Sequence, residues 1–575
     1  MKGQRFLLGR LGERLVKDGA LTDDQLRDAV QRQKQVGGFL GEIIVSMGFL
    51  TAGEIKPYLE EWTGFPFVDI VEEEIDRDLV AQVPKATVTA RLALPYREQH
   101  GRILVAMADP LDIETIDEYR ATLNKPIVAC LALSADLNEA IKRSFDARDK
   151  VKNLIHEIGE TSTQLVEDTA VDELIDQGQQ APIVRLVNSL VGGAVAAGAS
   201  DIHLEPQDGG VRVRYRIDGV MYEQMTLPAN HLAACISRLK IMGGLDIAER
   251  RRPQDGRFST RDDSGREFDI RLSLMPTVYG EKACMRLLEK ANALAKVEKI
   301  GFFPEQRAMF ERFIKRPHGL LLVTGPTGSG KSTTLYAALQ AINDSTKNIN
   351  TVEDPVEYRL SGINQMQVNA KIGVTFATGL RTLVRQDPDV ILVGEIRDKE
   401  TAEIAIQAAL TGHLVLSTLH TNDAPGALVR LQNMGVEPFL VSSAIIGIIG
   451  QRLLRLLCPS CRQEFTPNID IAMALGLPIV NGVVPPLARP VGCKRCGGRG
   501  TKGRSATLEI LPMTEKLREM VLARCSGPEL TSQAMNEGMI SMRENAIKKA
   551  LDFQVSLEEI VRVFAEDRFR NCNSG

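Results

Sequence analysis

A glycine-rich run is the part of this sequence whose residue types and spacing predict chemistry most directly. It follows the apolar residues 319–323, which are typical of a buried strand, and precedes a helical stretch at 333–341. Glycines leave backbone N–H groups free to converge on phosphate oxygens, and a helix N-terminus adds a favourable dipole. We expect Lys331 to reach the β- and γ-phosphates of a nucleotide and Ser332 to bind Mg²⁺, and a chance glycine-rich turn is the alternative. The predicted phosphate-binding residues are Gly325, Pro326, Thr327, Gly328, Ser329, Gly330, Lys331, Ser332 and Thr333.

An acidic residue after a second strand is the partner that such a loop requires. Residues 390–393 are four consecutive apolar residues, and Glu395 follows them at the end of the strand where open α/β sheets bind ligands. A carboxylate there can orient or polarise water, or hold Mg²⁺ through water. The alternative is that Glu395 and Arg397 form a surface ion pair.

Two further polar groups flank this strand. Glu353, Asp354 and Glu357 place three acids within five residues, and a nearby Mg²⁺ or arginine would relieve their repulsion. His413 and His420, two of only seven histidines, bracket one apolar strand. A single histidine is usually structural, but two at the ends of a strand beside the nucleotide sheet favour a functional role. We therefore expect all of these except Asp354 to be catalytic.

Four of the nine cysteines form two CxxC pairs, Cys458 with Cys461 and Cys493 with Cys496. A two-residue spacing lets both thiolates of a pair reach one ion, and four thiolates form a closed tetrahedral site without an open position. The pattern therefore predicts a structural Zn²⁺, and four unligated thiols are the alternative.

Basic residues that could complete a nucleotide site lie before the glycine-rich run. Arginine alternates along the predicted strand 211–217, and residues 250–252 are three consecutive arginines. Most of these side chains are expected to be solvated or ion-paired. We expect a few of them to contact the nucleotide, because ATPases with such a phosphate-binding loop complete their site with arginines from another domain or subunit.

The elements that position these residues belong to a chain of several domains, since 575 residues are too many for one core and suggest roughly four. A formal charge of −4 does not predict bulk affinity for nucleic acid. The N-terminus does not resemble a signal peptide, and the longest apolar stretch, residues 438–450, is too short to span a bilayer. We expect a cytosolic protein that reaches a membrane only through a partner.

An internal repeat opens the chain. The landmarks of residues 10–33 recur 29 positions later in residues 39–62, and each copy reads as a short helix followed by an amphipathic helix. Thr22 and Thr51 stand at the expected N-caps of the second helices.

The predicted fold is multidomain α/β. A helical tandem repeat is expected first, and strand–loop–helix–strand alternation from about residue 301 indicates a parallel sheet with helices on both faces. The predicted parts are the tandem repeat at 1–64, a small α/β subdomain at 65–145, a linker at 146–180, a mixed α/β domain at 181–300, the nucleotide-binding core at 301–457, a zinc insert at 458–500 and a C-terminal helical region at 501–575.

These motifs together resemble the ATPases of type II secretion and type IV pilus assembly. The resemblance implies a RecA-like P-loop core and a cytosolic homo-hexamer that docks on an inner-membrane platform protein and uses ATP to insert pilin or pseudopilin. The zinc insert and long N-terminal region resemble assembly rather than retraction ATPases. Arg216 and Arg257 lie in segments that match those supplying arginines to the nucleotide. The matching segments are residues 199–206, 254–257, 325–333, 351–357, 380–389, 394–398 and 413–420.

The N-terminal repeat resembles the tandem cyclic di-GMP-binding motif of some of these ATPases. The first copy matches well, whereas Phe39 and Trp62 in the second copy depart from the pattern. The alternative is a four-helix docking module for a membrane partner. The resemblance implies ligand contacts from Arg10, Leu11, Gly12, Gln33, Leu40 and Gly41.

Two other functions share a phosphate loop. A nucleic-acid translocase is disfavoured, because strand-tracking proteins use basic grooves and aromatic platforms, and only 5% of the residues are aromatic. A regulatory nucleotide sensor is disfavoured by the presence of Lys331, Ser332 and Glu395, which predicts turnover. Whether the product is a pilus, a type II pseudopilus or a DNA-uptake fibre stays open.

Overall fold

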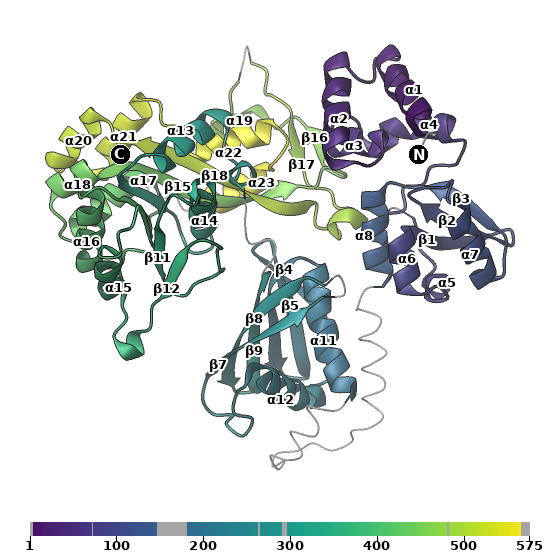
Figure 1. Ribbon diagram of the computed structural model, residues 1–575, viewed down its shortest axis with the longest axis horizontal. Helices are drawn as coiled ribbons and strands as arrows, with labels where there is room; N and C mark the ends of the chain where they lie inside the picture. The colour runs from purple at the N-terminus through teal and green to yellow at the C-terminus, as the bar shows by residue number, and fades with distance from the viewer. Residues whose placement is uncertain are drawn as a thin grey trace. The chain divides into compact units, whose positions relative to one another are not determined.

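The computed structural model describes residues 4–71, 73–145, 181–262, 265–289, 296–479 and 482–564. The predicted linker at 146–180 lies outside the described residues. The chain divides into two compact units, one within residues 1–163 and 188–196 and the other within residues 164–187 and 197–575. Each unit is described by itself below, with the elements labelled as in Figure 1.

The tandem repeat forms four helices in the N-terminal unit. Thr22 and Thr51 cap the second helix of each copy as predicted, because their side chains accept hydrogen bonds from the backbone N–H groups of Gln25 and Glu54. A shared apolar core, with Leu15 and Ile44 fully buried, holds the helices together. The four helices are α1 (Gln4–Lys17), α2 (Asp23–Val36), α3 (Leu40–Ser46) and α4 (Ala52–Thr63).

A three-stranded sheet with four helices completes the described part of this unit. Strand β2 lies between β1, which is antiparallel to it, and β3, which is parallel. The strand predicted at 102–107 and the helices predicted near 112–123 and 134–145 are β2, α7 and α8. The elements are α5 (Arg77–Ala81), α6 (Lys85–Arg91), β1 (Ala93–Gln99), β2 (Arg102–Met107), α7 (Ile113–Leu123), β3 (Ile127–Leu131) and α8 (Ser134–Ser144).

A six-stranded antiparallel sheet precedes the nucleotide-binding core. Its strand order is β6-β5-β4-β9-β8-β7, and it includes the strands predicted at 211–217 and 268–272. The elements are α11 (Ala181–Ala196), β4 (Ala199–Gln207), β5 (Gly210–Ile217), β6 (Val220–Leu227), η1 (Ala229–His231), α12 (Leu232–Gly243), β7 (Gln254–Arg261), β8 (Glu267–Thr277) and β9 (Gly280–Glu289).

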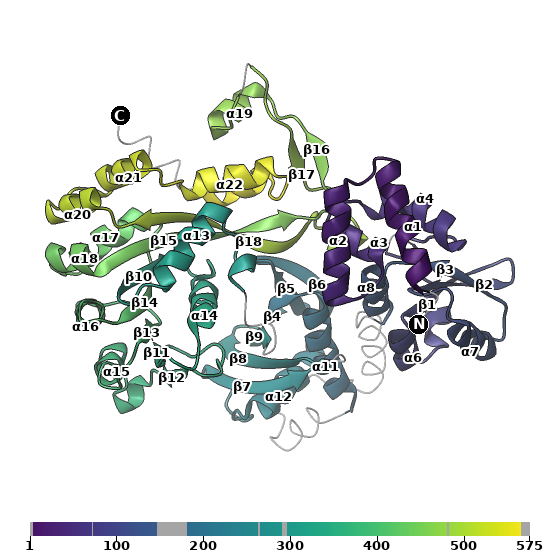
Figure 2. The same cartoon turned by 45° about the horizontal axis from the view of Figure 1, so that its top comes forward.

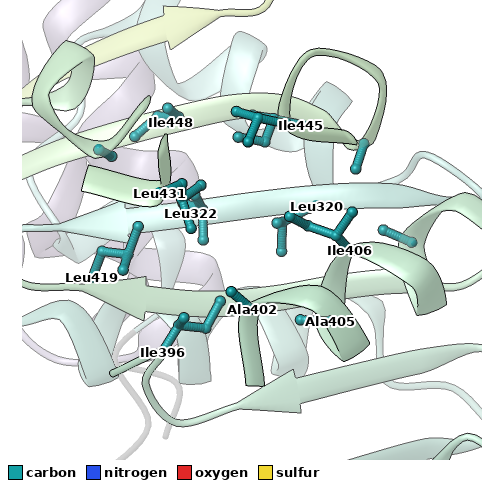
Figure 3. Close-up of a cluster of buried hydrophobic side chains, with 14 of the residues drawn as sticks. Leu320, Leu322, Ile396, Ala402, Ala405, Ile406, Leu419, Leu431, Ile445 and Ile448 are labelled. Carbon is teal, nitrogen blue, oxygen red and sulfur yellow. The ribbon is translucent and has the colours of Figure 1, made fainter. Parts of the chain in front are cut away.

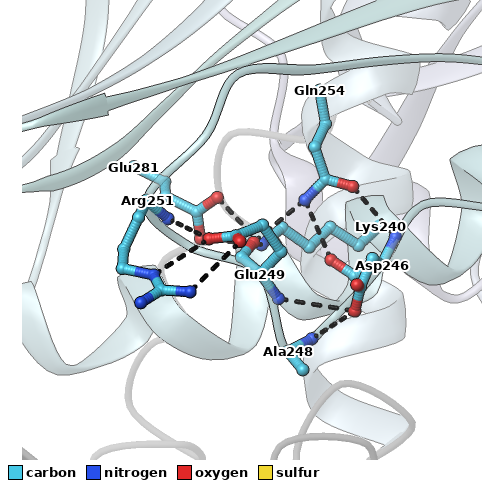
Figure 4. Close-up of polar contacts among 7 residues, drawn as sticks. All are labelled: Lys240, Asp246, Ala248, Glu249, Arg251, Gln254 and Glu281. Atoms are coloured by element: carbon cyan, nitrogen blue, oxygen red, sulfur yellow. Dashed lines mark hydrogen bonds and ion pairs between the residues drawn. The ribbon is translucent and has the colours of Figure 1, made fainter.

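A buried ion pair joins α12 to this sheet. The Nζ of Lys240 lies 2.8 Å from the carboxylate of Glu281 on β9 and donates to the carbonyl of Glu249 at 2.7 Å. Figure 4 shows Gln254 and Asp246 in the same polar network. Because removing one partner would leave an unpaired charge in the interior, the pair fixes the position of α12 against β9.

The core contains a seven-stranded sheet with the order β12-β11-β13-β14-β10-β15-β18. All neighbouring pairs are parallel except β15 and β18. The strands are β10 (Gly319–Thr324), β11 (Ile349–Glu353), β12 (Asn364–Gln367), β13 (Val390–Val393), β14 (Leu414–Leu419), β15 (Ile445–Leu457) and β18 (Thr501–Pro512).

Both faces of this sheet are covered, as the sequence predicted from its continuous apolar runs. Leu320 and Leu322 of β10 belong to the apolar cluster on one face, which Figure 3 shows with Ile406 of α16. Leu321 and Val323 belong to the cluster on the other face. The helices of the core are η2 (Val297–Lys299), α13 (Pro304–Ile314), α14 (Lys331–Ile342), η3 (Ala370–Ile372), α15 (Phe376–Leu383), α16 (Lys399–Leu410), α17 (Ala424–Asn433) and α18 (Pro438–Ala444).

The region predicted as a C-terminal helical domain begins differently from expectation. Residues 501–512 form β18, which pairs antiparallel with β15 and extends the core sheet, and its residues 506–511 are all buried. The predicted helices that follow are present as α20 (Glu515–Leu522), α21 (Gly527–Asn536), α22 (Met542–Leu551) and α23 (Leu557–Phe564).

The cysteine insert connects β15 to β18 and is visible in Figure 2 through β16, β17 and α19. Its elements are β16 (Gln463–Phe465), α19 (Ile469–Leu475), β17 (Leu487–Arg489) and η4 (Lys494–Cys496). Among the described residues of the whole chain, no helix combines the length and the apolar character needed to cross a membrane.

Candidate nucleotide-binding site and cysteine cluster

The glycine-rich loop joins β10 to α14, which is the strand–loop–helix arrangement that phosphate binding requires. Gly325 has a φ of 149°, and a Cβ there would lie 2.3 Å from the carbonyl oxygen of Gln451. Only glycine fits this position, so the backbone can turn sharply at the end of β10. Ser329 has a buried hydroxyl without a hydrogen-bond partner among the described residues, which suits a loop that binds phosphate oxygens.

Gln451 of β15 braces the loop from behind, and the sequence analysis did not identify it. Its Nε2 donates to the carbonyl of Ser329 at 2.8 Å, and its Oε1 accepts from Thr334 of α14 at 2.7 Å. Gln451 is buried, so both bonds are shielded from water. The only sequence signal was a polar residue directly after the apolar run 438–450.

Lys331 lies at the first position of α14 and is nearly buried. Its Nζ donates to the carbonyl oxygens of Gly325 and Pro326 at 2.9 and 3.0 Å. Burial lowers the pKa of Lys331, and the negative charge of Glu395 opposes that shift. The ammonium is therefore held within the loop by neutral carbonyls, which the oxygens of a bound phosphate could replace. Ser332 and Thr333 follow on the exposed first turn of α14.

Glu395 follows β13 at the carboxyl edge of the sheet, as predicted. Two hydroxyl groups of β14 fix the end of β13: Ser417 donates to the carbonyl of Val393 and Thr418 to that of Gly394, both at 2.7 Å. The residue after Glu395 is tied down as well, because the N–H of Ile396 donates to the carbonyl of Thr418. The position of the carboxylate is therefore determined by β14.

Two cations or potential cations contact the Glu395 carboxylate. His420 Nε2 lies 3.1 Å from one oxygen, and Arg397 lies 2.5 Å from the other. The ion pair considered as the alternative is thus present, and it raises the pKa of Arg397 through the hydrogen bond to Glu395. The carboxylate is only 13% exposed, whereas Arg397 is 65% exposed. The contact with His420 places a second polar group of the predicted site at the same edge.

His413 does not lie with these residues. It precedes β14, and its backbone carbonyl accepts from the N–H of Gly319 at the beginning of β10, which is the amino edge of the sheet. Its Nδ1 contacts the carbonyl of Ala408 at 2.8 Å. The six residues of β14 separate His413 from His420, and seven steps of extended chain span roughly 23 Å. Strand direction thus puts the two histidines at opposite edges of the sheet, and only His420 lies beside Glu395; the catalytic role predicted for His413 stays a prediction.

The two glutamates of the 351–357 segment have different surroundings. Glu353 is buried at the end of β11 and accepts hydrogen bonds from Tyr336, Thr351 and Gln365. Burial and the negative charge of Glu353 raise the pKa of Tyr336. Glu357 pairs with Arg271 of β8 at 2.7 Å, so an arginine does relieve the local negative charge, as expected.

Arginines of four strands lie in one row across the six-stranded sheet. The register pairs Arg257 of β7 with Arg271 of β8, Arg271 with Arg286 of β9, Arg286 with Asp201 of β4, and Asp201 with Arg216 of β5. Directly opposed residues of neighbouring strands point to the same face. The row therefore contains both predicted arginines, and it adds Arg271 and Arg286.

The members of this row are not equivalent. Asp201 holds Arg286 at 2.9 Å and Arg216 at 3.6 Å, and Arg216 also donates to the carbonyl of Gly219. Arg257 is exposed and forms no ion pair within the described part of the chain. Only Arg271 forms an ion pair with the 351–357 segment among the described residues. The signal that could have identified it was its place on the polar side of the predicted strand 268–272.

The four cysteines of the insert gather at one point, with their sulfur atoms within 4.8 Å of one another. Three of the separations are 3.8 to 3.9 Å. Tetrahedral Zn²⁺ with Zn–S bonds of about 2.3 Å requires sulfur separations of about 3.8 Å. The cluster therefore fits one zinc ion.

Backbone N–H groups favour the thiolate form of Cys496, whereas burial raises the pKa of Cys461 and of Cys493. Cys493 and Gly500 donate to the sulfur of Cys496 at 3.2 and 3.1 Å, and Gly492 donates to Cys461 at 3.3 Å. Burial alone would raise the pKa of Cys496, but the N–H groups of Cys493 and Gly500, together with the Cys493 and Cys461 side chains, bring it down to about 7. A thiolate is the form that binds a metal.

The predicted cyclic di-GMP contacts lie on the first three helices of the N-terminal unit. Leu11 and Gly12 lie inside α1, and Leu40 and Gly41 begin α3, so both Leu-Gly pairs belong to helices. A Cβ on Gly12 would lie 2.6 Å from Leu26, and one on Gly41 would lie 3.1 Å from Leu59. The glycines thus let helices pack closely, and both leucines are buried in the core.

Gln33 and Arg10 are the remaining candidates of that set. Gln33 Nε2 donates to the carbonyl of Gly38 in the loop before α3. The side chain of Arg10 lies outside the described residues. Phe39, which departs from the repeat pattern, is 38% exposed.

Comparison with known proteins gives two family matches. The family described as Type II/IV secretion system protein matches residues 176–562, which is more than half of the chain. The MshEN domain matches residues 63–151, which begin after the predicted cyclic di-GMP contacts.

Two curated relatives and one solved structure extend these matches. The type IV pilus assembly ATPase PilB of Myxococcus xanthus is 42% identical over 98% of this chain and 100% of its own length. The type II secretion system protein E of Pseudomonas aeruginosa is 48% identical over 69% of this chain and 78% of its own. The X-ray structure of the Yersinia pseudotuberculosis ATPase DotB is 20% identical with a TM-score of 0.50, covering 66% of this chain and 93% of that one, and it supports the fold alone.

Proposed function

Because this chain belongs to the type II/IV secretion system protein family, we propose that it is a motor ATPase in which Lys331, Glu395 and His420 form the hydrolytic site for type IV pilus assembly or type II secretion. The observation that carries the proposal is the Glu395 carboxylate, which contacts His420 at 3.1 Å and whose charge acts on the phosphate-loop lysine. A carboxylate at that place can orient the water that attacks the γ-phosphate.

Each residue has a distinct part in the proposed reaction. Lys331 exchanges its bonds to the carbonyls of Gly325 and Pro326 for phosphate oxygens and neutralises charge on the β- and γ-phosphates. Ser332, exposed at the first turn of α14, would hold Mg²⁺, and that ion would supply charge neutralisation between the phosphates. Glu395 orients water, and His420, which follows β14 directly, holds the carboxylate in place.

Arginines of the six-stranded sheet complete the proposed site. Arg271 is the leading candidate, because its ion pair with Glu357 brings a guanidinium to the segment after β11. Arg286 and Arg257 are its neighbours on the adjacent strands and present cations on the same face. A planar guanidinium is suited to the charge that develops on a phosphoryl group in transfer.

The cysteine cluster is proposed to hold one structural zinc ion. Four sulfur ligands leave no open coordination position, so the ion would stabilise the 458–500 insert without taking part in hydrolysis. We further propose the assembly that the family resemblance implies: a homo-hexamer in the cytoplasm, bound at the inner membrane to a platform protein.

The test is hydrolysis by the purified chain and by two variants. Wild type is expected to hydrolyse ATP with Mg²⁺. Lys331→Ala should lose nucleotide binding, and Glu395→Gln should bind ATP normally with turnover reduced by about 100-fold or more. Arg397→Gln is the matched control, because it removes the exposed ion-pair partner and leaves the carboxylate and His420 in place. Turnover near wild type in Glu395→Gln would remove this residue from the mechanism.

A second proposal concerns regulation by cyclic di-GMP in the N-terminal unit. The match to the MshEN domain favours it, although that match covers residues 63–151 and not the tandem repeat. Gln33 and Arg10 are the contacts proposed to remain, since Leu11, Gly12, Leu40 and Gly41 support helix packing. Calorimetry of the full chain with cyclic di-GMP tests whether the ligand binds. The same measurement on Arg10→Ala tests whether Arg10 contacts it. Heat that is unchanged in Arg10→Ala would place the ligand elsewhere.

A further inference from the structure

A buried glutamate joins two helix N-termini behind the proposed site. Glu509 of β18 is 4% exposed, and its carboxylate accepts from the N–H of Ala424 at 2.6 Å and from the N–H of Met542 at 3.2 Å. Ala424 and Met542 are the first residues of α17 and α22. Their N–H groups have no partner within their own helices, so one carboxylate satisfies a free donor of each helix.

The neighbouring strand leaves room for this carboxylate. Gly450 of β15 is paired with Glu509, and a Cβ at position 450 would lie 2.7 Å from the Glu509 side chain. The next residue, Gln451, is the one that braces the phosphate loop through Ser329. Glu509 therefore occupies a space built at the same level of the sheet as the phosphate loop.

The contacts of Glu509 lead directly to the proposed catalytic histidine. Ala424 is four residues after His420, and the intervening loop is tied at several points. The carbonyl of Asp423 accepts from Thr421 at 2.9 Å and from Thr324, the last residue of β10, at 3.4 Å. Asp423 also caps α17. A movement of α17 relative to β18 would thus displace the loop 420–424, which includes His420.

We propose that Glu509 is a positioning residue for ATP hydrolysis, which holds the loop 420–424 in place and links it to α22 in the C-terminal helices. The inference rests on the proposed function, since it assigns Glu509 an effect through His420. A carboxylate has two equivalent acceptor oxygens, one for each helix. Glutamine would keep one acceptor and turn its NH₂ group toward the other N–H, so one of the two links would be lost.

The experiment measures kcat and KM for ATP in Glu509→Gln. The expected result is a roughly tenfold lower kcat with KM and nucleotide affinity within about twofold of wild type, because the phosphate loop keeps its own brace. Glu559→Gln is the matched control. Glu559 is a buried carboxylate of α23 that bonds Arg455 and Arg562 and does not contact the loop. Its kcat should stay within about twofold.

A double-mutant cycle separates positioning from general structural support. If Glu509 acts through His420, adding Glu509→Gln to His420→Ala should lower kcat by less than about twofold. Amide hydrogen exchange in Glu509→Gln should also be faster than in wild type at residues 421–426 and unchanged at residues 331–342. Should Glu509→Gln not fold, Glu509→Asp, which keeps the carboxyl group but is one methylene shorter, is measured in the same way.

The outcomes distinguish this inference from the proposed function. The positioning role would be overturned if the kcat losses of Glu509→Gln and His420→Ala multiplied in the double mutant. It would also be overturned if Glu559→Gln lost as much kcat as Glu509→Gln. Neither result would affect the ATPase assignment. Full kcat in Glu509→Gln would overturn the positioning role as well. A wild-type chain without ATP hydrolysis would instead contradict the proposed function itself.

Discussion

The two edges of the seven-stranded sheet carry similar residues but differ in what surrounds them. At the carboxyl edge, His420 contacts Glu395, and the phosphate loop with Lys331 follows β10. At the amino edge, His413 contacts only backbone and the hydroxyl of Thr411 among the described residues. Both histidines flank the same strand, so the residue type does not determine the role.

The difference shows that, in a parallel sheet, strand direction decides which polar residues meet at one edge. Every loop that leaves a carboxyl end arrives at the same edge, so residues from β10, β13 and β14 meet there although they are far apart in sequence. Loops at the amino edge lead into the strands and mainly complete backbone hydrogen bonds. The following predictions test how far this contrast holds, in order of decreasing effect on turnover.

Arg271→Ala is expected to have the largest effect on turnover. It tests whether the residues at the carboxyl edge can hydrolyse ATP without an arginine from the six-stranded sheet. Turnover should fall about 100-fold with ATP affinity within a few-fold of wild type, since the cation acts on charge that develops in the transition state. Steady-state kinetics and nucleotide binding measure the two quantities. Arg271→Lys should recover little, because it lacks the planar fork.

Arg216→Ala is the control within the same row. Its guanidinium is already engaged by Asp201 and the carbonyl of Gly219, so turnover should change by less than about threefold. A loss in Arg216→Ala as large as that in Arg271→Ala would reverse this ranking and support the original expectation for Arg216.

The two histidines give the direct test of the comparison. His420→Ala should lower kcat about tenfold, because Glu395 loses the partner that fixes one of its oxygens. His413→Ala should leave kcat within about twofold and cost about 1 kcal/mol of stability for the lost bond to Ala408. Equal losses of kcat in the two variants would show that the amino edge also serves hydrolysis.

Removal of zinc should affect stability more than turnover. The cluster begins at Cys458, directly after β15 and eight residues beyond Gly450, or roughly 25 Å along the strand from the level of the phosphate loop. Elemental analysis should find about one zinc per chain. Chelation or Cys458→Ser should lower the melting temperature, with turnover per folded chain within about threefold. Protein kept reduced and free of chelator that holds no zinc would contradict the assignment.

The buried carboxyl group of Glu509 should make the stability of the fold depend on pH, and this prediction concerns unfolding and not turnover. Burial raises the pKa of Glu509 from 4.5 to about 7, the charge of Asp423 adds to the shift, and the backbone donors and Arg452 oppose it. Between these two values the unfolded state releases its proton before the folded state does. The free energy of unfolding therefore falls as pH rises from about 4.5 to 7, by up to about 3 kcal/mol relative to Glu509→Gln.

Denaturation of wild type and variant from pH 5 to 8 measures this difference. Glu559→Gln provides the contrast: burial would raise the pKa of Glu559, but hydrogen bonds from Arg562 and Arg455 lower it. Its contribution is already complete above 4.5, so its curve should run parallel to wild type over this range. A constant gap between wild type and Glu509→Gln would mean that Glu509 does not titrate there.

Much of the fold followed from local patterns. Thr22 and Thr51 cap helices because a hydroxyl three residues before a helical N–H can satisfy it, whatever the rest of the chain does. The four-residue apolar run of β13 indicated a strand buried on both faces, and it is one. The exception was residues 501–512, which form a strand rather than part of a helical region.

The sequence by itself determined the phosphate loop and the cysteine cluster, because their chemistry depends on residues at short, fixed spacings. Only the tertiary structure decided that His420 and not His413 joins Glu395, and that Arg271 is the arginine that reaches Glu357. It also revealed Gln451 and Glu509, which bond residues 33 to 122 positions away. Such partners are set by strand order, strand direction and sheet register, which are non-local properties that no short sequence pattern encodes.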